Sequence, residues 1–376
     1  MDIVIGSFNV LNLKTKEKDK NETFKEQKCK KIANLIKQNK FDIIALQEIL
    51  SDDAVKRIVE CLNNKGSNGP YDYCHCASLY EELNNSPLGI RNRNGSTFKS
   101  DYGFIWNTQK VSLYGDEALY KALDDIEKRE WGSFLERIVD ILIKAYKEAV
   151  SQGGRDSGLF SKLPQGKSLE ECRERLLATL HQTLRPPLIA CFKPSSFYGS
   201  LLHEIRIINT HTQWGKGKSD VKSAKQIRQE EMRFIQGHLH NRINTLRTGS
   251  FNSVYTVVAG DFNLSIDEIA PIYTGDSTLF GNHSMKTIQA KQSTCKWDEK
   301  SECFFPKSND HNGNCDHKGN YDHFAYDATR IDALVPGGAA PIEITKDNFL
   351  IDDDKIPVSD HKPVSDHKPI KMTLKF

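Results

Sequence analysis

Apolar and polar positions alternate between strand-like and helix-like patterns along most of the chain. The segment 3–11, IVIGSFNVL, is rich in β-branched residues and predicts a strand. Residues 22–39 place apolar side chains at helical spacing. Residues 41–49, FDIIALQEI, form a short, almost wholly apolar run that is typical of a strand covered on both faces. Apolar spacing predicts a second helix around 54–62.

The same alternation continues toward the C-terminus. Residues 220–244 predict a helix. Further strands are predicted at 71–79, 102–107, 187–193, 204–212, 254–262, 330–336 and 370–376. Many strands with few helices between them indicate an α/β fold, in which sheets pack together and helices lie outside them.

One segment, 116–184, contains no strand pattern. Its apolar residues recur at helical spacing until Gly153 and Gly154, and Ser168 with Glu171 forms a capping box for another helix. We interpret 116–184 as a helical hairpin inserted into a single domain that covers 1–376. The hairpin either packs on the body or offers a lid or a surface for a protein partner.

Composition excludes several classes of protein. The chain has 376 residues, of which 38% are hydrophobic and 27% charged, as is usual for a globular domain. The net charge of +2 means that affinity for a polyanion must come from local clusters. The nine scattered cysteines indicate reduced thiols. No apolar run reaches the roughly 18 residues of a membrane span, and the first residues lack a signal-peptide pattern, so we expect a cytoplasmic protein without membrane contact.

Polar residues repeatedly end the predicted strands. Each of them alone has an ordinary explanation, because Asn and Asp cap turns. Together they indicate one crevice, since strand ends in an α/β sheet meet at the same edge. The residues concerned are Asn9, Gln47, Glu48, His211, Asp261, Asn263, Asp332 and an Asp-His pair before the last strand.

This mixture of side chains suits phosphodiester hydrolysis. Mg²⁺ prefers oxygen ligands and takes one or two carboxylates, which makes Glu48 the natural ligand, with Asn9 beside it. Hydrolysis also needs a base for water and an acid for the leaving oxygen, and two histidines supply them. Asn263 and Arg185 suit the neutralisation of charge on the phosphate.

The motifs FNVLN, LQE, NTH, GDFN, RID and SDHKP occur in this order. They resemble the signature series of the endonuclease/exonuclease/phosphatase superfamily. Within it, the chain is most similar to the deoxyribonuclease I family, through 86–112 and through LRPPLIACF at 184–192. The resemblance covers most of the chain except roughly 115–180.

The resemblance implies a four-layer α/β sandwich of two packed mixed β-sheets flanked by helices, with the site at one rim. It implies a divalent cation, Mg²⁺ or Mn²⁺ with Ca²⁺ as an alternative. It also assigns the site residues. The expected metal ligands are Glu48, Asn9 and Asp366. The histidine pair is His211 and His367, and Asp332 is expected to orient the second histidine. The phosphate or water is expected to contact Asp261 and Asn263, and Arg185 is expected to bind the phosphate.

The hexapeptide VSDHKP occurs twice, at 358–363 and 364–369. In the resembling family the Asp-His pair directly precedes the final strand. After His367 the apolar residues alternate as in a strand, whereas after His361 there is no room for one and a proline would interrupt it. We therefore choose Asp366 and His367 as the catalytic copy. The alternative is that Asp360 and His361 occupy the site.

Two departures from the family pattern concern substrate. Leu11 and Leu50 stand where the family has arginines that contact the DNA groove, which weakens the expectation of duplex binding. Lysines 14, 16, 18 and 20 follow the first strand, and lysines 216, 218, 222 and 225 follow His211. Such lysine clusters either bind a polyanionic backbone or belong to lysine-rich loops that only contact solvent.

A second cluster consists of Cys295, Cys303, His311, Cys315, His317 and His323. Its spacings fit no standard zinc finger, so a structural Zn²⁺ is not expected.

The sequence therefore predicts a metal-dependent phosphodiesterase acting on nucleic acid, most like a DNA endonuclease. One alternative is a phosphatase or phosphodiesterase for lipid or inositol phosphates, although the tryptophan motifs of the inositol phosphatases are absent from the sequence. The other is a non-catalytic interaction module on the same fold.

Overall fold

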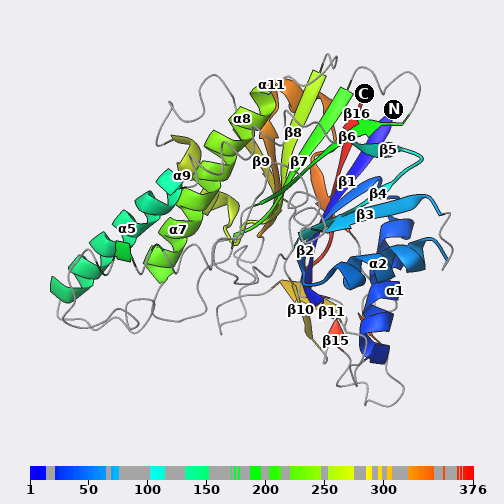
Figure 1. Ribbon diagram of the computed structural model, residues 1–376, viewed down its shortest axis with the longest axis horizontal. Coiled ribbons are helices and arrows are strands. Elements are labelled where there is room, and N and C mark those ends of the chain that lie inside the picture. Colours follow the sequence, from blue (N-terminus) through cyan, green and yellow to red (C-terminus); the bar gives the residue numbers. More distant parts are fainter. Residues whose placement is uncertain are drawn as a thin grey trace.

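The computed structural model describes fourteen longer stretches of the chain and a few short or single positions. These are residues 1–13, 22–64, 69–75, 102–114, 132–151, 171, 173, 174, 177, 187–195, 203–212, 221–246, 253–274, 285–289, 295–298, 303–306, 321–342, 350–351, 362–363, 365 and 367–376. Two six-stranded sheets lie at the centre of the molecule, with helices on either side (Figure 1).

The strands of each sheet come from distant parts of the chain. The first sheet has the order β13 (Ala339–Pro341), β16 (Ile370–Lys375), β1 (Asp2–Leu13), β2 (Ile43–Ile49), β4 (Tyr102–Asn107) and β3 (Tyr71–His75). The second has the order β5 (Val111–Tyr114), β6 (Leu188–Pro194), β7 (His203–His211), β8 (Ser253–Asp261), β12 (Asp322–Asp327) and β9 (Met285–Gln289). Each sheet contains one parallel pair, β1–β2 in the first and β7–β8 in the second, and its other pairings are antiparallel.

Alternation along the strands builds three apolar layers. On β1, Ile3 and Ile5 belong to the core between the sheets, whereas Phe8 and Val10 pack against the helices α1 (Glu22–Gln38) and α2 (Asp52–Leu62). The outer face of the second sheet is covered in the same way. Its helical layer consists of α5 (Gly132–Ser151), α7 (Val221–Arg233), the π-helix η3 (Phe234–Leu239), α8 (His240–Thr245) and α9 (Ile266–Thr274).

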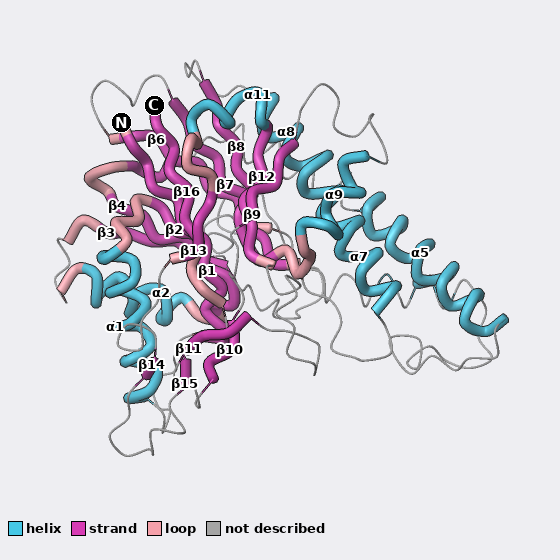
Figure 2. The backbone as a smooth tube through the Cα atoms, turned by 180° about the vertical axis from the view of Figure 1, so that it is seen from behind, coloured by secondary structure: helices cyan, strands magenta, loops and turns pink. Residues whose placement is uncertain are grey.

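The expected fold class is confirmed: two mixed sheets pack face to face and helices flank both, which makes a four-layer α/β sandwich (Figure 2). Two small two-stranded sheets are added to it. One pairs β10 (Cys295–Asp298) with β11 (Cys303–Pro306), and the other pairs β14 (Leu350–Ile351) with β15 (Lys362–Pro363).

The expected helical insertion is described in part. Helix α5 lies within 116–184, and its buried residues Phe134, Leu135 and Ile138 join the apolar cluster under α7. Arg173, from the region of the second expected helix, forms ion pairs with Glu136 and Asp140 of α5. The apolar stripe of α5 is thus used for packing on the body, which is one of the two roles expected for it.

One strand prediction is wrong. The segment 330–336 is not a strand: α11 (Ala328–Ile331) and a 3₁₀ turn, η4 (Asp332–Leu334), occupy it. The strand lies upstream, at Asp322–Asp327, where all six residues are buried. This strand contains two aspartates and a histidine, so the sequence suggests a polar segment and not a buried strand. The apolar residues Phe324 and Tyr326 nevertheless alternate as in a strand.

A glycine is required where β7 and β8 run side by side before the site. Gly260 has φ 153°, and a Cβ added to it would lie 1.7 Å from the carbonyl oxygen of Thr210.

Gly260→Ala should therefore lower the free energy of unfolding by about 3 kcal/mol or more, as measured by urea titration. In the control variant Gly132→Ala, the new methyl group meets nothing within 4 Å, and we expect a change below about 1 kcal/mol. Equal stability of the two variants would contradict this account.

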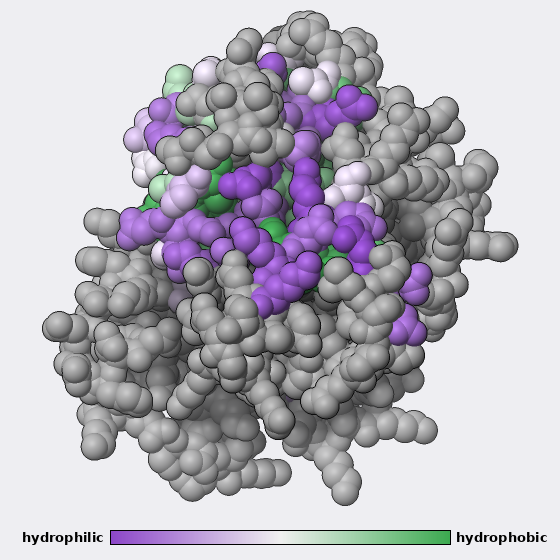
Figure 3. Space-filling model, turned by 90° about the vertical axis from the view of Figure 1, so that its left-hand side faces the viewer, coloured by the Kyte–Doolittle hydropathy of each residue, from purple (hydrophilic) through white to green (hydrophobic). Residues whose placement is uncertain are grey.

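Within the part of the chain that the structure describes, no helix has the length and apolar character needed to span a bilayer. Seen from the left of Figure 1, where α5, α7 and α9 lie, the described surface is mostly hydrophilic, with small apolar areas between (Figure 3).

Candidate active site

The two parallel strand pairs end at a common rim. In the first sheet Asn9 of β1 pairs with Gln47 of β2, and in the second His211 of β7 pairs with Asp261 of β8. The carboxyl ends of parallel neighbours lie at the same edge. Because the two sheets pack face to face with β1 against β8, the predicted polar strand ends come together from both sheets.

Successive side chains of a strand point to opposite faces of its sheet, so every second side chain faces the opposite sheet. The apolar residues that precede Asn9, His211 and Asp261 at alternate positions belong to the core between the sheets. The three polar side chains therefore continue the inward face of their strands beyond the apolar core. All three are nearly inaccessible to solvent.

Asn9 links the two sheets. Its Nδ2 donates to Oε1 of Glu48 at 3.1 Å and to Oδ2 of Asp261 at 3.1 Å. Glu48 follows the inward-facing Gln47, and its φ of 56° interrupts the alternation of β2. Its carboxylate accepts a further hydrogen bond from the backbone N–H of Asn12 at 2.9 Å, and its side chain keeps 16% exposure. The sequence-predicted neighbours Glu48 and Asn9 are thus brought together.

Two imidazoles approach the same carboxylate oxygen. Nε2 of His211 lies 3.7 Å from Oδ2 of Asp261, and Nε2 of His367 lies 3.6 Å from it. Nε2 of His211 is also 3.9 Å from Oε1 of Glu48. Burial raises the pKa of Asp261, the positive charges of His367 and His211 oppose that rise, and the charge of Asp322 adds to it.

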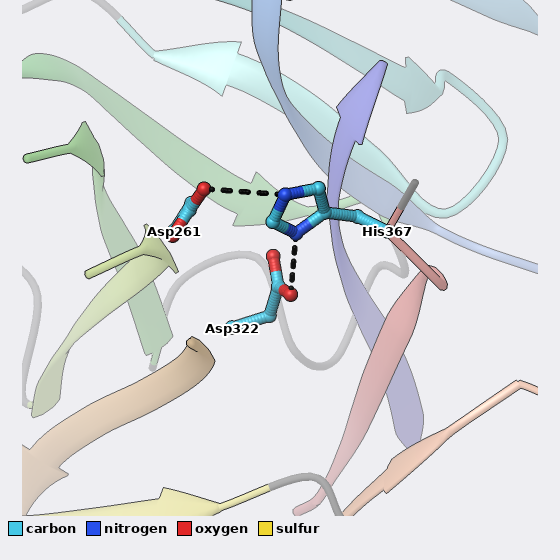
Figure 4. A group of neighbouring side chains, drawn as sticks. All are labelled: Asp261, Asp322 and His367. Carbon is cyan, nitrogen blue, oxygen red and sulfur yellow. Dashed lines mark hydrogen bonds and ion pairs between the residues drawn. The ribbon is translucent and has the colours of Figure 1, made fainter. Parts of the chain in front are cut away.

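Asp322 fixes the second histidine (Figure 4). Its Oδ2 lies 2.8 Å from Nδ1 of His367, and the carboxylate is fully buried. A carboxylate at Nδ1 keeps a proton on that nitrogen, so Nε2 is the nitrogen presented toward Asp261. The backbone of His367 is held as well, because its N–H donates to Oγ of Ser365, which itself donates to the carbonyl of Asn9.

The expected role of Asp332 is therefore corrected. Its side chain is 46% exposed and accepts from Nζ of Lys286 and from the hydroxyl of Tyr326, and Lys286 lowers its pKa. It does not contact His367 in this structure; Asp322 does. The error follows from the misplaced strand. Asp322 opens the true strand β12 and pairs with Asp261, which brings its carboxylate to the site.

Asn263 adjoins the site through the turn after β8. Its φ is 47°, and its backbone N–H donates to Oδ1 of Asp261 at 2.9 Å. Its side-chain amide donates to the carbonyl of Thr212, which follows His211. Asn263 thus connects the ends of β7 and β8, close to the carboxylate that both histidines approach.

Sequence reasoning missed several residues that support the site. The hydroxyl of Tyr102 accepts from the backbone N–H of His211 at 2.9 Å. Below the rim, Nε2 of Gln47 donates to Oδ1 of Asn209 at 2.7 Å, and Asn209 donates to the carbonyl of Leu46 across the sheets. Asn209 occupies an inward position of β7, two residues before His211, and this spacing is the signal that could have identified it.

Several expected site residues fall outside the described residues: Arg185, Asp360, His361, Asp366 and the lysines 14, 16, 18, 20, 216 and 218. The duplicated hexapeptide contains His361 and His367. The structure describes His367, which lies in the site, whereas His361 is outside the described residues. Lys362 and Pro363, which follow His361, pair with β14. In the Cys/His cluster, His311, Cys315 and His317 are also outside, and His323 is a buried histidine whose Nε2 lies 2.8 Å from the carbonyl oxygen of Leu264.

The donor set fits a hard divalent cation. The carboxylates of Glu48 and Asp261 both accept from Nδ2 of Asn9, whose Oδ1 accepts from the backbone N–H of Leu11. Asp322 places a carboxylate oxygen within 4.8 Å of one of Asp261, and carboxylate oxygens of this kind suit Mg²⁺ or Mn²⁺. Glu48 is the most exposed of the three carboxylates and is the candidate ligand. Asp261, Asp322 and His367 also place one donor atom each within 4.8 Å of one another, but Asp322 and His367 already bond each other.

Comparisons with known proteins give matches at the level of structure. No family model matches the chain, and no curated protein matches it. Similar solved structures include TDP2 of D. rerio complexed with single strand DNA product, at 13% identity and a TM-score of 0.45, covering 100% of this chain and 99% of that one.

Two bacterial structures are similar to the same degree. An endonuclease/exonuclease/phosphatase of Bacteroides vulgatus is 12% identical with a TM-score of 0.46, covering 100% of this chain and 99% of that one. A mannosyl-6-phosphatase of Bacteroides thetaiotaomicron is 12% identical with a TM-score of 0.44, and each chain is covered completely. Similarity this low carries no conclusion about the family or the substrate of this chain.

Proposed function

We propose that this protein is a divalent-metal-dependent phosphodiesterase that hydrolyses nucleic acid, with DNA as the favoured substrate. The observation that supports it most is the convergence of two imidazoles, His211 and His367, on one buried carboxylate, which Asn9 links to Glu48. Two proton-transferring groups beside a candidate cation ligand are what phosphodiester hydrolysis requires.

The residues of the site have different roles in the hydrolysis. Glu48, with Asn9 beside it, would hold a cation, which when bound polarises a phosphoryl oxygen. Because Asp322 holds the proton on Nδ1, His367 exchanges protons at Nε2. Nε2 of His211 approaches the same oxygen of Asp261. One imidazole takes a proton from water and the other donates one to the leaving oxygen. Asn263 and Arg185 are proposed to bind the phosphate.

Nucleic acid is favoured as the substrate by the lysines of the sequence. Clusters of lysine follow directly after β1 and after β7, the strands that carry Asn9 and His211 to the rim. Of these lysines, the side chain of Lys225 is described, and it is 40% exposed beside Glu268. Cations flanking a hydrolytic site attract a chain of phosphates more strongly than a single phosphate group, because each further phosphate adds a contact.

The test is a substrate and metal panel. Single-stranded DNA, linear duplex, supercoiled plasmid and p-nitrophenyl phosphate are incubated with Mg²⁺, Mn²⁺ or Ca²⁺, or with a chelator. We expect strand cleavage with Mg²⁺ or Mn²⁺, its loss on chelation and its return when metal is added back. Hydrolysis of the monoester without strand cleavage would indicate a phosphatase instead. Binding of DNA without turnover under every condition would indicate a non-catalytic module.

A further inference from the structure

The segment after Asn9 forms an unusual turn at the rim of the site. Leu11 and Asn12 both have φ 51°, so two consecutive residues other than glycine adopt the left-handed conformation. The register between β1 and β2 shifts at the same place, between Asn9 and Leu13. Side chains with a Cβ disfavour this conformation, and it persists only where surrounding contacts impose it.

Those contacts are present on both sides of Leu11. Its backbone N–H donates to Oδ1 of Asn9 at 3.0 Å, and its carbonyl accepts from Nζ of Lys28 at 2.9 Å. Lys28 comes from α1 and is only 5% exposed. The next N–H, that of Asn12, donates to Glu48. The turn thus forms hydrogen bonds with Glu48, the residue proposed to hold the cation, with its neighbour Asn9 and with the buried ammonium of Lys28.

The side chain presented by this turn is apolar and accessible. Leu11 is 37% exposed, and among the described residues it and Met1 are the large hydrophobic side chains that reach solvent to this extent. Glycine or asparagine would adopt the conformation at lower cost. A leucine held there against its backbone preference, beside the hydrolytic residues, indicates a function for its side chain.

We propose that Leu11 is a specificity-determining residue that packs against the face of a nucleobase next to the scissile phosphate. This inference rests on the proposed function. A leucine offers neither charge nor hydrogen bonds to phosphate or sugar, so apolar area is its only contribution. The faces of the bases are the apolar surface of a nucleic acid, and contact with them is tolerant of sequence.

The experiment compares two substrates of equal charge: a single-stranded oligodeoxynucleotide and the same strand with tetrahydrofuran abasic residues in place of its nucleotides. For the wild-type protein with Mg²⁺, KM should be lower for the strand with bases. Leu11→Ala and Leu11→Asn should each raise KM for that strand roughly three- to tenfold, the effect of exposing part of a leucine side chain to water. They should change KM for the abasic strand by less than about twofold. Leu11→Met, which keeps the apolar area, should preserve most of the preference.

Two results would overturn the role of Leu11. One is an unchanged preference for bases in both Leu11→Ala and Leu11→Asn. The other is an equal loss on the two substrates, which would mean that the turn serves only to place Glu48. Failure of the proposed function is recognised separately, because the wild-type protein would then cleave neither strand in any metal.

Discussion

Glu48→Gln should lower kcat/KM for single-stranded DNA about a thousandfold, the size of effect expected when one electrostatic group of a hydrolytic site is lost. Glutamine keeps the length of the side chain but removes the charge. It also brings an NH₂ group to a position where both oxygens of Glu48 now accept hydrogen bonds, from Asn9 and from the backbone of Asn12. The affinity for a cation should fall together with the activity.

Metal binding gives a second measurement that does not depend on turnover. A ligand that binds only the folded protein raises its melting temperature, so Mg²⁺ or Mn²⁺ should raise the Tm of the wild-type protein in a concentration-dependent way. Glu48→Gln should abolish most of this shift. The control is Glu60→Gln, which changes an exposed carboxylate of α2. A variant that loses neither activity nor the metal-dependent shift would show that Glu48 is not the ligand.

Asp322→Asn should lower kcat by about a hundredfold or more and change KM much less, whereas Asp332→Asn should stay within about twofold of the wild-type protein. The fully buried carboxylate of Asp322 holds the proton on Nδ1 of His367, and an amide at this position can impose the wrong tautomer. The carboxylate of Asp332 is half exposed and makes a surface ion pair with Lys286, which contributes little to stability.

Steady-state kinetics on one oligonucleotide, together with urea titration of each variant, separates catalytic from structural effects. Both substitutions exchange a carboxylate for an amide of the same shape, so each is the matched control of the other. A loss of kcat in Asp332→Asn as large as that in Asp322→Asn would contradict the placement of Asp322 behind His367.

Much of the fold follows from the period of the apolar residues. The strands at 3–11 and 41–49 and the helices at 22–39 and 54–62 are found within a few residues of their predicted limits, because burial on one or two faces leaves a clear pattern. The short strands β9 and β5 were missed. The strand β12 was missed for a different reason, since it carries polar residues at buried positions.

The candidate site was predictable to the extent that strand ends share an edge. Asn9, Glu48, His211 and Asp261 were identified as polar residues at the ends of apolar strands, and the structure brings them together. His367 was chosen over His361 because a clean alternation of apolar residues follows it. That choice relies on the final strand β16, which the structure contains at Ile370–Lys375.

The sequence by itself determined that Asn9, Glu48, His211 and Asp261 stand at the ends of apolar strands, because the period and composition of a strand are local properties that need no knowledge of its neighbours. Only the tertiary structure decided which carboxylate serves His367. Asp322 and Asp332 are both acidic residues near a predicted strand, and nothing local distinguishes them. The antiparallel pairing of β12 with β8 sets Asp322 opposite Asp261, and the packing of the two sheets brings His367 to it across 45 positions of the chain. Contacts between distant strands depend on register and sheet packing, which no short stretch of sequence encodes.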